Sequence, residues 1–241
     1  MDVFEGYTGI RWESEQLIHD VFLFIIIVLL AIFALVFRTF YPLFEKIIRG
    51  LFSIKERQNL FDTPTKENVF FTGYMGFQTL FLCAIFFFFV YCRITAYLWG
   101  RLLLDLILLT VFFTILILFY LLKRILYYIY GRTAVGRDKF RLWKNNYNAA
   151  FFMWGILLYL PVLWLMFDHI HFSGILILFV FTYILFRFYV IYIKFHIFYP
   201  KNTGLLYFSL YLCAQEIIPL LFLYESLSYL HNVIESNILW Q

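Results

Sequence analysis

Two charged residues lie near the centres of long apolar segments, where charges are rarely tolerated. Arg187 lies within the run 174–198, and Glu216 lies within the run 204–225. A charge at the centre of a bilayer costs about 2.5–3.5 kcal/mol on insertion scales, so each of these side chains must face protein and find a partner. Such a pair can relay protons, hold an ion, or fix two helices against each other.

The spacing of the two charges predicts that they meet. The segments that carry them are joined by the short turn PKNTG at 200–204, which predicts an antiparallel helical hairpin. Arg187 lies about thirteen residues before this turn and Glu216 about twelve after it, so both lie roughly 18–20 Å from it along a helix. We therefore expect an Arg187–Glu216 ion pair at the middle of the membrane.

Polar neighbours support this expectation. Tyr183 precedes the arginine by one helical turn and shares its face, while Cys213 shares the face of the glutamate. Pro219 removes the helical partner of the Gln215 carbonyl, which leaves a further acceptor beside the glutamate. The pair could simply fix the register of two helices, or it could form a proton relay or ion site, and the sequence leaves both interpretations open.

Composition excludes a soluble globular protein. Of the 241 residues, 64% are hydrophobic, 24% aromatic and 14% charged, and the mean hydropathy is +0.84. Soluble domains are about 45–50% apolar and about 25% charged. Runs near the ~20 residues that cross a bilayer predict an all-α bundle of six membrane spans, forming a single domain over 1–241. These spans lie at about 18–37, 69–92, 102–122, 149–167, 174–198 and 204–225.

The distribution of basic residues predicts the orientation. Segment 38–67 carries six Lys and Arg residues, segment 123–144 carries seven, and Lys194 and Lys201 mark a third turn on the same side. Because short basic loops stay in the cytoplasm, this bias places both termini on the other side, which in a bacterium is the periplasm. We therefore expect a multi-pass protein of the cytoplasmic (inner) membrane.

The two basic segments have further interpretations. Residues 42–56 place apolar side chains at helical spacing opposite Lys46 and Arg49, which predicts an amphipathic helix on the inner leaflet. The stretch GRTAVGRDKFRLWKNNYN at 131–148 mixes basic and aromatic residues, and it could bind anionic lipid headgroups, a partner protein or RNA. We expect anionic lipid at both segments and no nucleic acid.

Two other features receive structural interpretations. Arg101 and Asp105 lie one helical turn apart near the outer end of the third span, where an ion pair contributes little and acts as an anchor. Gly73 and Gly76 in the stretch TGYMG indicate close helix packing.

Motifs for catalysis or metal binding are weak or missing. His169 and His171 could hold a metal ion only in an extended turn with a third ligand, and the sequence contains no P-loop, G-x-S-x-G or H-E-x-x-H pattern. Cys83, Cys92 and Cys213 fall in or at the ends of spans, which favours small core residues over disulfides or zinc ligands. We expect no enzymatic activity, no metal and no cofactor, and a lipid-modifying enzyme acting through the two histidines is the weakest alternative.

The stretch LYLCAQEIIPLLFLY at 210–224 resembles the C-terminal signature of a bacterial family of integral membrane proteins, domain of unknown function 4271. The resemblance aligns a glutamate and a proline of the family with Glu216 and Pro219, and an arginine of the preceding span with Arg187. Gln215 departs from the pattern, which has an apolar residue there. The resemblance implies a multi-pass membrane protein and implies no particular activity.

Two functions from different classes remain open. The first is a non-enzymatic subunit or scaffold of a membrane complex that serves envelope biogenesis or protein export, since the sequence contains neither a catalytic constellation nor an extended path of titratable groups. The second is a proton- or ion-coupled transporter that uses Arg187 and Glu216.

Overall fold

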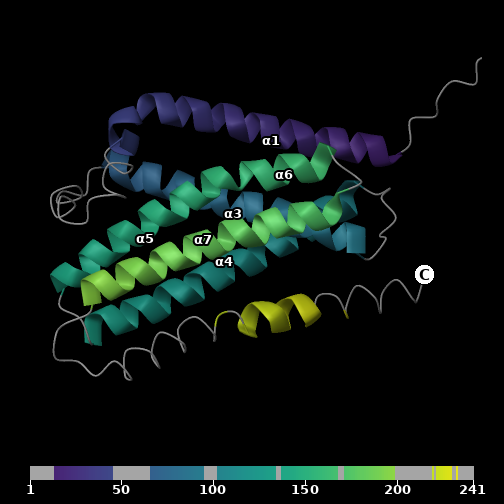
Figure 1. The fold of residues 1–241 in the computed structure, drawn as a ribbon. Coiled ribbons are helices and arrows are strands. Elements are labelled where there is room, and N and C mark those ends of the chain that lie inside the picture. The colour runs from purple at the N-terminus through teal and green to yellow at the C-terminus, as the bar shows by residue number, and fades with distance from the viewer. Residues whose placement is uncertain are drawn as a thin grey trace, which may run out of the picture.

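The described part of the chain is helical almost throughout (Figure 1). The computed structural model describes residues 14–45, 66–94, 102–133, 137–167, 171–198, 219, 221–229 and 232. The helices are α1 (Ser14–Thr39), α3 (Lys66–Ile94), α4 (Leu102–Thr133), α5 (Arg137–Leu157), α6 (Tyr159–Phe167) and α7 (Phe172–Phe198). Residues 221–229 are also helical, and these described ranges contain no β-strand.

Five stretches are long and apolar enough to cross a membrane, which confirms the helical membrane class. They are Asp20–Thr39, Val69–Ile94, Leu103–Ile129, Trp143–Phe167 and Phe172–Ile193.

The sixth span and the amphipathic helix stay predictions. The span 204–225 falls mostly outside the described residues. Residues 41–45 are helical, but the rest of the amphipathic segment 42–56 also lies outside them.

Two helices extend beyond the predicted spans at the basic end of the bundle. α4 continues to Thr133 instead of ending near residue 122, and α5 begins at Arg137 instead of near residue 149. The segment predicted to be an inner loop therefore consists mainly of two helix ends. Hydropathy detects only the part of a helix inside the hydrocarbon, whereas Lys and Arg are good helix formers that let the helix continue beyond it.

The helices α5 and α6 form one span that is interrupted at Leu158. Pro161 has no N–H to donate to the carbonyl of Leu157, and its ring crowds that carbonyl. The Leu158 N–H still donates to the Trp154 carbonyl at 3.0 Å, and the Val162 N–H donates to the Leu158 carbonyl at 3.2 Å. The chain therefore crosses as a single span despite the interruption.

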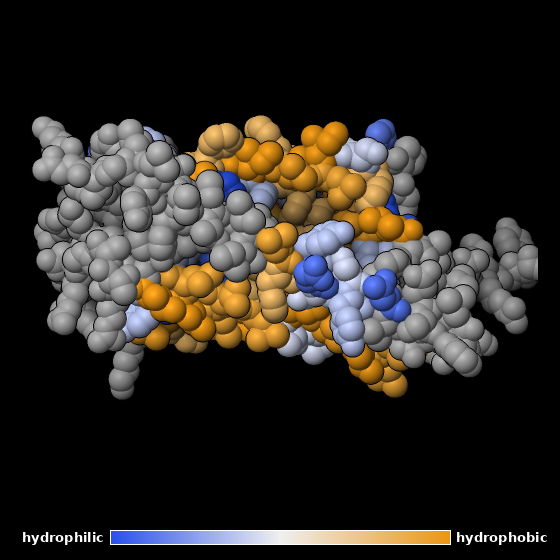
Figure 2. All heavy atoms as spheres, turned by 90° about the horizontal axis from the view of Figure 1, so that it is seen from below, coloured by the Kyte–Doolittle hydropathy of each residue, from blue (hydrophilic) through white to orange (hydrophobic). Residues whose placement is uncertain are grey.

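Helix α3 and the α5–α6 span form the centre of the bundle. In each of them 61% of the most apolar stretch is buried in protein, against 22% for α1, 28% for α4 and 22% for α7. Figure 1 shows α1 along one edge, and α3 lies close to both α4 and α5. Figure 2 shows that hydrophobic side chains form most of the described surface on the face seen there, as a bilayer requires.

Phenylalanine rings fill the contacts around α3. Phe22 of α1 stacks on Phe88 with centroids 5.0 Å apart, and Phe86 stacks on Phe179 of α7 at 4.0 Å. Phe22, Phe86 and Phe88 are at most 1% exposed. Some of the many aromatic residues therefore pack in the core, and others lie on the lipid-facing surface.

A close approach between α3 and α5 occurs at Gly155. A Cβ atom added there would overlap Thr79 Oγ1 and lie 2.9 Å from Thr79 Cβ. At Gly73 and Gly76 an added Cβ would have no atom within 4 Å. The prediction that these two glycines mark close packing is therefore wrong, because they lie on a more open face of α3.

Candidate functional site

Arg187 lies on α7 and contacts the tyrosine one turn before it. Its Nε donates to the Tyr183 hydroxyl at 2.7 Å, and its guanidinium carbon lies 5.1 Å from the centroid of the same ring. The Tyr183 ring in turn packs on Trp154 of α5 at 5.7 Å. The shared face predicted for Tyr183 and Arg187 is confirmed, and it connects the arginine to the central helices.

Three of the other predicted members of the site, Glu216, Gln215 and Cys213, lie outside the described residues. Pro219 is described, and it is helical and buried. The Arg187–Glu216 ion pair therefore stays a prediction.

Arg187 lines a cavity of about 200 Å³ inside the bundle. Its walls come from α3, α4, α5 and α7, and Leu223 of the helix 221–229 also contributes. The lining is mainly apolar and aromatic, but it includes a second cationic side chain, Lys123. Two basic residues from different helices thus contribute to one interior cavity.

Lys123 is a site residue that the sequence interpretation missed. The basic residues of segment 123–144 predict an inner loop, whereas the Lys123 side chain is only 4% exposed and its Nζ lies 5.8 Å from the centroid of the Tyr127 ring. The buried positions Phe112, Leu116, Lys123 and Tyr127 follow one helical stripe. This periodicity was the signal that could have placed Lys123 on the inner face.

A second polar group of residues joins α1, α3 and α6. Gln78 Nε2 donates to the Tyr159 hydroxyl at 3.1 Å, and the Tyr74 hydroxyl donates to the Leu29 carbonyl at 3.4 Å. Gln78 is 1% exposed, and its Oε1 has no hydrogen-bond partner within the described part of the chain. These contacts hold helices together near the centre of the bundle.

The contact between Gln78 and Tyr159 can be measured with a double-mutant cycle. Gln78→Met and Tyr159→Phe should each lower the stability of the purified protein, because each leaves a buried polar group with one partner fewer. Hydrogen bonds between membrane helices are worth about 0.6 kcal/mol on average and up to ~1.7 kcal/mol, so a coupling energy in that range is expected. Unfolding of both single variants and the double variant measures it, and strictly additive losses would contradict the contact.

Arg93 joins three helices at the C-terminal end of α3. Its Nη2 donates to the Leu165 carbonyl of α6 at 3.2 Å, and its guanidinium lies 5.6 Å from the Phe172 ring of α7. Arg93 itself belongs to the last turn of α3. This arginine therefore has a structural role, because its contacts join α3 to α6 and α7.

Asp105 is buried, which contradicts its interpretation as an interfacial anchor. It is 1% exposed, neither carboxylate oxygen has a hydrogen-bond partner among the described residues, and it lies within electrostatic range of Cys92. It shares a buried face of α4 with Leu108 and Leu109, which turns it toward protein. Arg101, its predicted partner, lies outside the described residues.

The described histidines and cysteines do not form a metal site. Across the described ranges no group of three or more His, Cys, Asp and Glu residues could hold a metal ion. His171 is exposed, and His169 is not among the described residues. Cys83 and Cys92 are buried and unlinked, which confirms their interpretation as core residues.

These helices, apolar on their outer faces and joined by a few buried polar contacts, define a multi-span helical membrane protein. The sequence pattern of the family described as Domain of unknown function (DUF4271) matches residues 22–227. The chain belongs to this family, which confirms the resemblance seen at 210–224. No curated protein and no solved structure matches the chain.

Proposed function

We propose that the protein is a non-enzymatic subunit or scaffold of a complex in the cytoplasmic membrane of a bacterium, serving envelope biogenesis or protein export. The observation that carries this proposal is the use of the buried polar groups. Gln78 of α3 bonds to Tyr159 of α6, and Arg93 of α3 bonds to the Leu165 carbonyl of α6, so these two polar groups serve to join helices.

The outer faces supply surfaces on which partner helices could pack. Phe24 and Leu35 of α1 are 66% and 64% exposed, and Ile177 and Phe188 of α7 are 69% and 67% exposed. In lipid, helices associate through van der Waals packing, interhelical hydrogen bonds and lipid entropy instead of through a hydrophobic driving force. The proposed role as a subunit places partner helices on these two peripheral faces, which the rest of the described chain leaves uncovered.

Purification from native membranes tests the proposal. The tagged full-length protein, extracted in a mild detergent, should bring down defined membrane proteins in fixed ratio, whereas a tagged membrane protein of another family should not. A monodisperse monomer without partners at every detergent strength would argue against the role as a subunit.

The orientation is part of the same proposal. With the basic helix ends in the cytoplasm, both termini lie in the periplasm, and anionic lipid surrounds the basic segments. Alkaline phosphatase fused to the C-terminus should be active, because this enzyme matures only outside the cytoplasm. An inactive but stable fusion would place the C-terminus in the cytoplasm and contradict this part of the proposal.

A proton- or ion-coupled transporter is the second candidate, favoured by the interior cavity that Lys123 and Arg187 line. Ionisable groups inside a membrane bundle often mark transport paths. Reconstitution in liposomes with a pH-sensitive dye tests this function. Flux that is lost in Glu216→Gln, with the fold intact, would support the transporter, and the absence of flux in the unaltered protein would exclude it under those conditions.

A further inference from the structure

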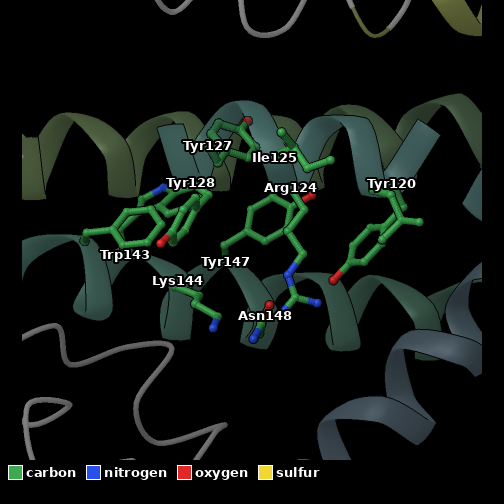
Figure 3. Close-up of a pocket in the computed structure, with 11 residues that line it drawn as sticks. Tyr120, Arg124, Ile125, Tyr127, Tyr128, Trp143, Lys144, Tyr147 and Asn148 are labelled. Atoms are coloured by element: carbon green, nitrogen blue, oxygen red, sulfur yellow. The ribbon is translucent and has the colours of Figure 1, made fainter. Parts of the chain in front are cut away.

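A second cavity, of about 400 Å³, lies between the C-terminal half of α4 and the N-terminal half of α5 (Figure 3). It is at the end of the bundle where the basic residues gather, close to the points where the apolar stretches end at Ile129 and begin at Trp143. It is lined by Tyr120, Leu121, Arg124, Ile125, Tyr127, Tyr128, Phe140, Trp143, Lys144, Tyr147 and Asn148. The cavity is therefore level with one membrane surface.

One basic side chain from each helix reaches this cavity. Arg124 of α4 and Lys144 of α5 lie close enough for their charges to repel, and the Tyr120 hydroxyl interacts with Arg124. Figure 3 shows the Arg124 guanidinium near the Asn148 side chain, with the Lys144 ammonium directed to the same side. None of the described lining residues is acidic. An anion held between the two cations would replace their repulsion with charge-assisted hydrogen bonds.

The walls of the cavity are aromatic and preformed. Trp143 packs against Tyr127 with centroids 4.5 Å apart and stacks on Tyr147 at 5.3 Å, and Trp143 is only 4% exposed. Aromatic residues with one polar edge are typical of the level where lipid headgroups meet hydrocarbon. The walls thus combine an apolar surface with hydroxyl donors at headgroup depth.

The rim of the cavity faces the bilayer. Leu121, Ile125 and Tyr128 are 44%, 57% and 54% exposed on the outer side of α4. On a membrane-spanning helix, exposed aliphatic side chains contact acyl chains. A ligand that enters from this side has an apolar tail along α4 and an anionic group at the two cations, and a phospholipid has both parts.

We propose that this cavity binds one anionic phospholipid, with its phosphate between Arg124 and Lys144 and an acyl chain along Leu121 and Ile125. This goes beyond the diffuse attraction of lipid to the basic segments, because it assigns a discrete site with two named cations. The lipid site depends on the proposed orientation in one respect: that orientation makes the cytoplasmic leaflet the source of the lipid. It does not depend on a partner protein.

Lipid titration of the purified full-length protein by native mass spectrometry tests the site. Phosphatidylglycerol should bind more tightly than phosphatidylcholine of the same chain length. Arg124→Gln and Lys144→Gln should each weaken phosphatidylglycerol binding on the order of tenfold, the effect of losing one charge-assisted hydrogen bond. Arg124→Lys, which keeps the charge, should recover part of the loss and control for folding.

Arg38→Gln is the matched control. Arg38 is exposed in the last turn of α1, at the same end of the bundle, and its replacement changes the net charge equally. Binding in this variant should stay within about twofold of the unaltered protein, because the residue is not part of the cavity lining. Equal losses in all three variants would show diffuse electrostatic attraction and overturn the site.

Two further outcomes would also overturn the proposal. Equal affinity for phosphatidylcholine would remove the anionic preference, and inorganic phosphate that binds as tightly as the lipid would remove the role of the acyl chain. Because the titration uses the isolated chain, its result is independent of co-purification. Failure of the lipid site can therefore be distinguished from failure of the proposed role as a subunit.

Discussion

Replacing Gly155 with alanine should destabilise the bundle, because the added methyl group would overlap Thr79 Oγ1. Thr79 has little room to move, since it is 1% exposed and its hydroxyl donates to the Met75 carbonyl at 2.8 Å. Overpacking of this kind typically costs ~1–3 kcal/mol. Alanine also stabilises a helix by up to ~1 kcal/mol relative to glycine. A net loss of stability in this variant would therefore show that the cost of the clash exceeds this gain.

Thermal unfolding in detergent provides the measurement, and Gly73→Ala is the matched control. An added Cβ at Gly73 has no atom within 4 Å, so that variant should be as stable as the unaltered protein or slightly more stable. Combining Gly155→Ala with Thr79→Gly should restore much of the lost stability, because the second change removes the obstructing side chain. If Gly155→Ala and Gly73→Ala behave alike, α3 and α5 are not in the close contact described.

The membrane class and the approximate positions of the five described spans could be predicted because lipid imposes a simple rule on the sequence. Each crossing segment must bury its backbone polar groups in a helix and present apolar side chains, so hydropathy locates it directly. The ends of α4 and α5 could not be predicted in this way. Their basic and aromatic residues leave the hydrocarbon while the helix continues to Thr133 and resumes at Arg137.

Side-chain contacts within one helix could be predicted from the sequence, whereas contacts between helices could not. The contact between Tyr183 and Arg187 follows from their spacing of one turn, so the sequence predicts it. The hydrogen bond between Gln78 and Tyr159 joins residues 81 positions apart, and a single sequence contains no signal for it. Lys123 differs in another way, since its charge in a basic segment predicts a loop, whereas the helical spacing of its buried neighbours places it on an inner face.

The glycines also show that a single sequence does not reveal which positions pack closely against another helix. Gly73 and Gly76 lie three residues apart, not the four of the G-x-x-x-G packing motif, and neither meets another helix closely. Gly155 stands alone in the sequence, and its importance depends on Thr79, which belongs to a different helix. Which glycine allows close packing is decided by the partner surface, and that surface is defined only once the helices are assembled.

Replacing Asp105 with asparagine should raise the stability of the protein, which is the opposite of the usual effect of altering a buried residue. The carboxylate is 1% exposed and its oxygens have no hydrogen-bond partner among the described residues. A buried polar group left without a partner costs ~1–3 kcal/mol, and more when it is charged. Asparagine keeps the shape and removes the charge, but its amide is still a buried polar group without a partner among the described residues, so only the extra cost of the charge is recovered and a gain of about 1 kcal/mol is expected.

Thermal unfolding of Asp105→Asn beside Asp20→Asn measures this gain. Asp20 is exposed on α1, so its replacement makes the same change in net charge without altering a buried group. The control should leave the unfolding temperature nearly unchanged, since exposed charges contribute little to stability. A loss of stability in Asp105→Asn alone would show that the carboxylate has a partner in the folded protein, and Arg101, one turn before it, would be the residue to test. A gain would identify Asp105 as a group that the fold buries at a cost, which makes it a second candidate for function beside Arg187.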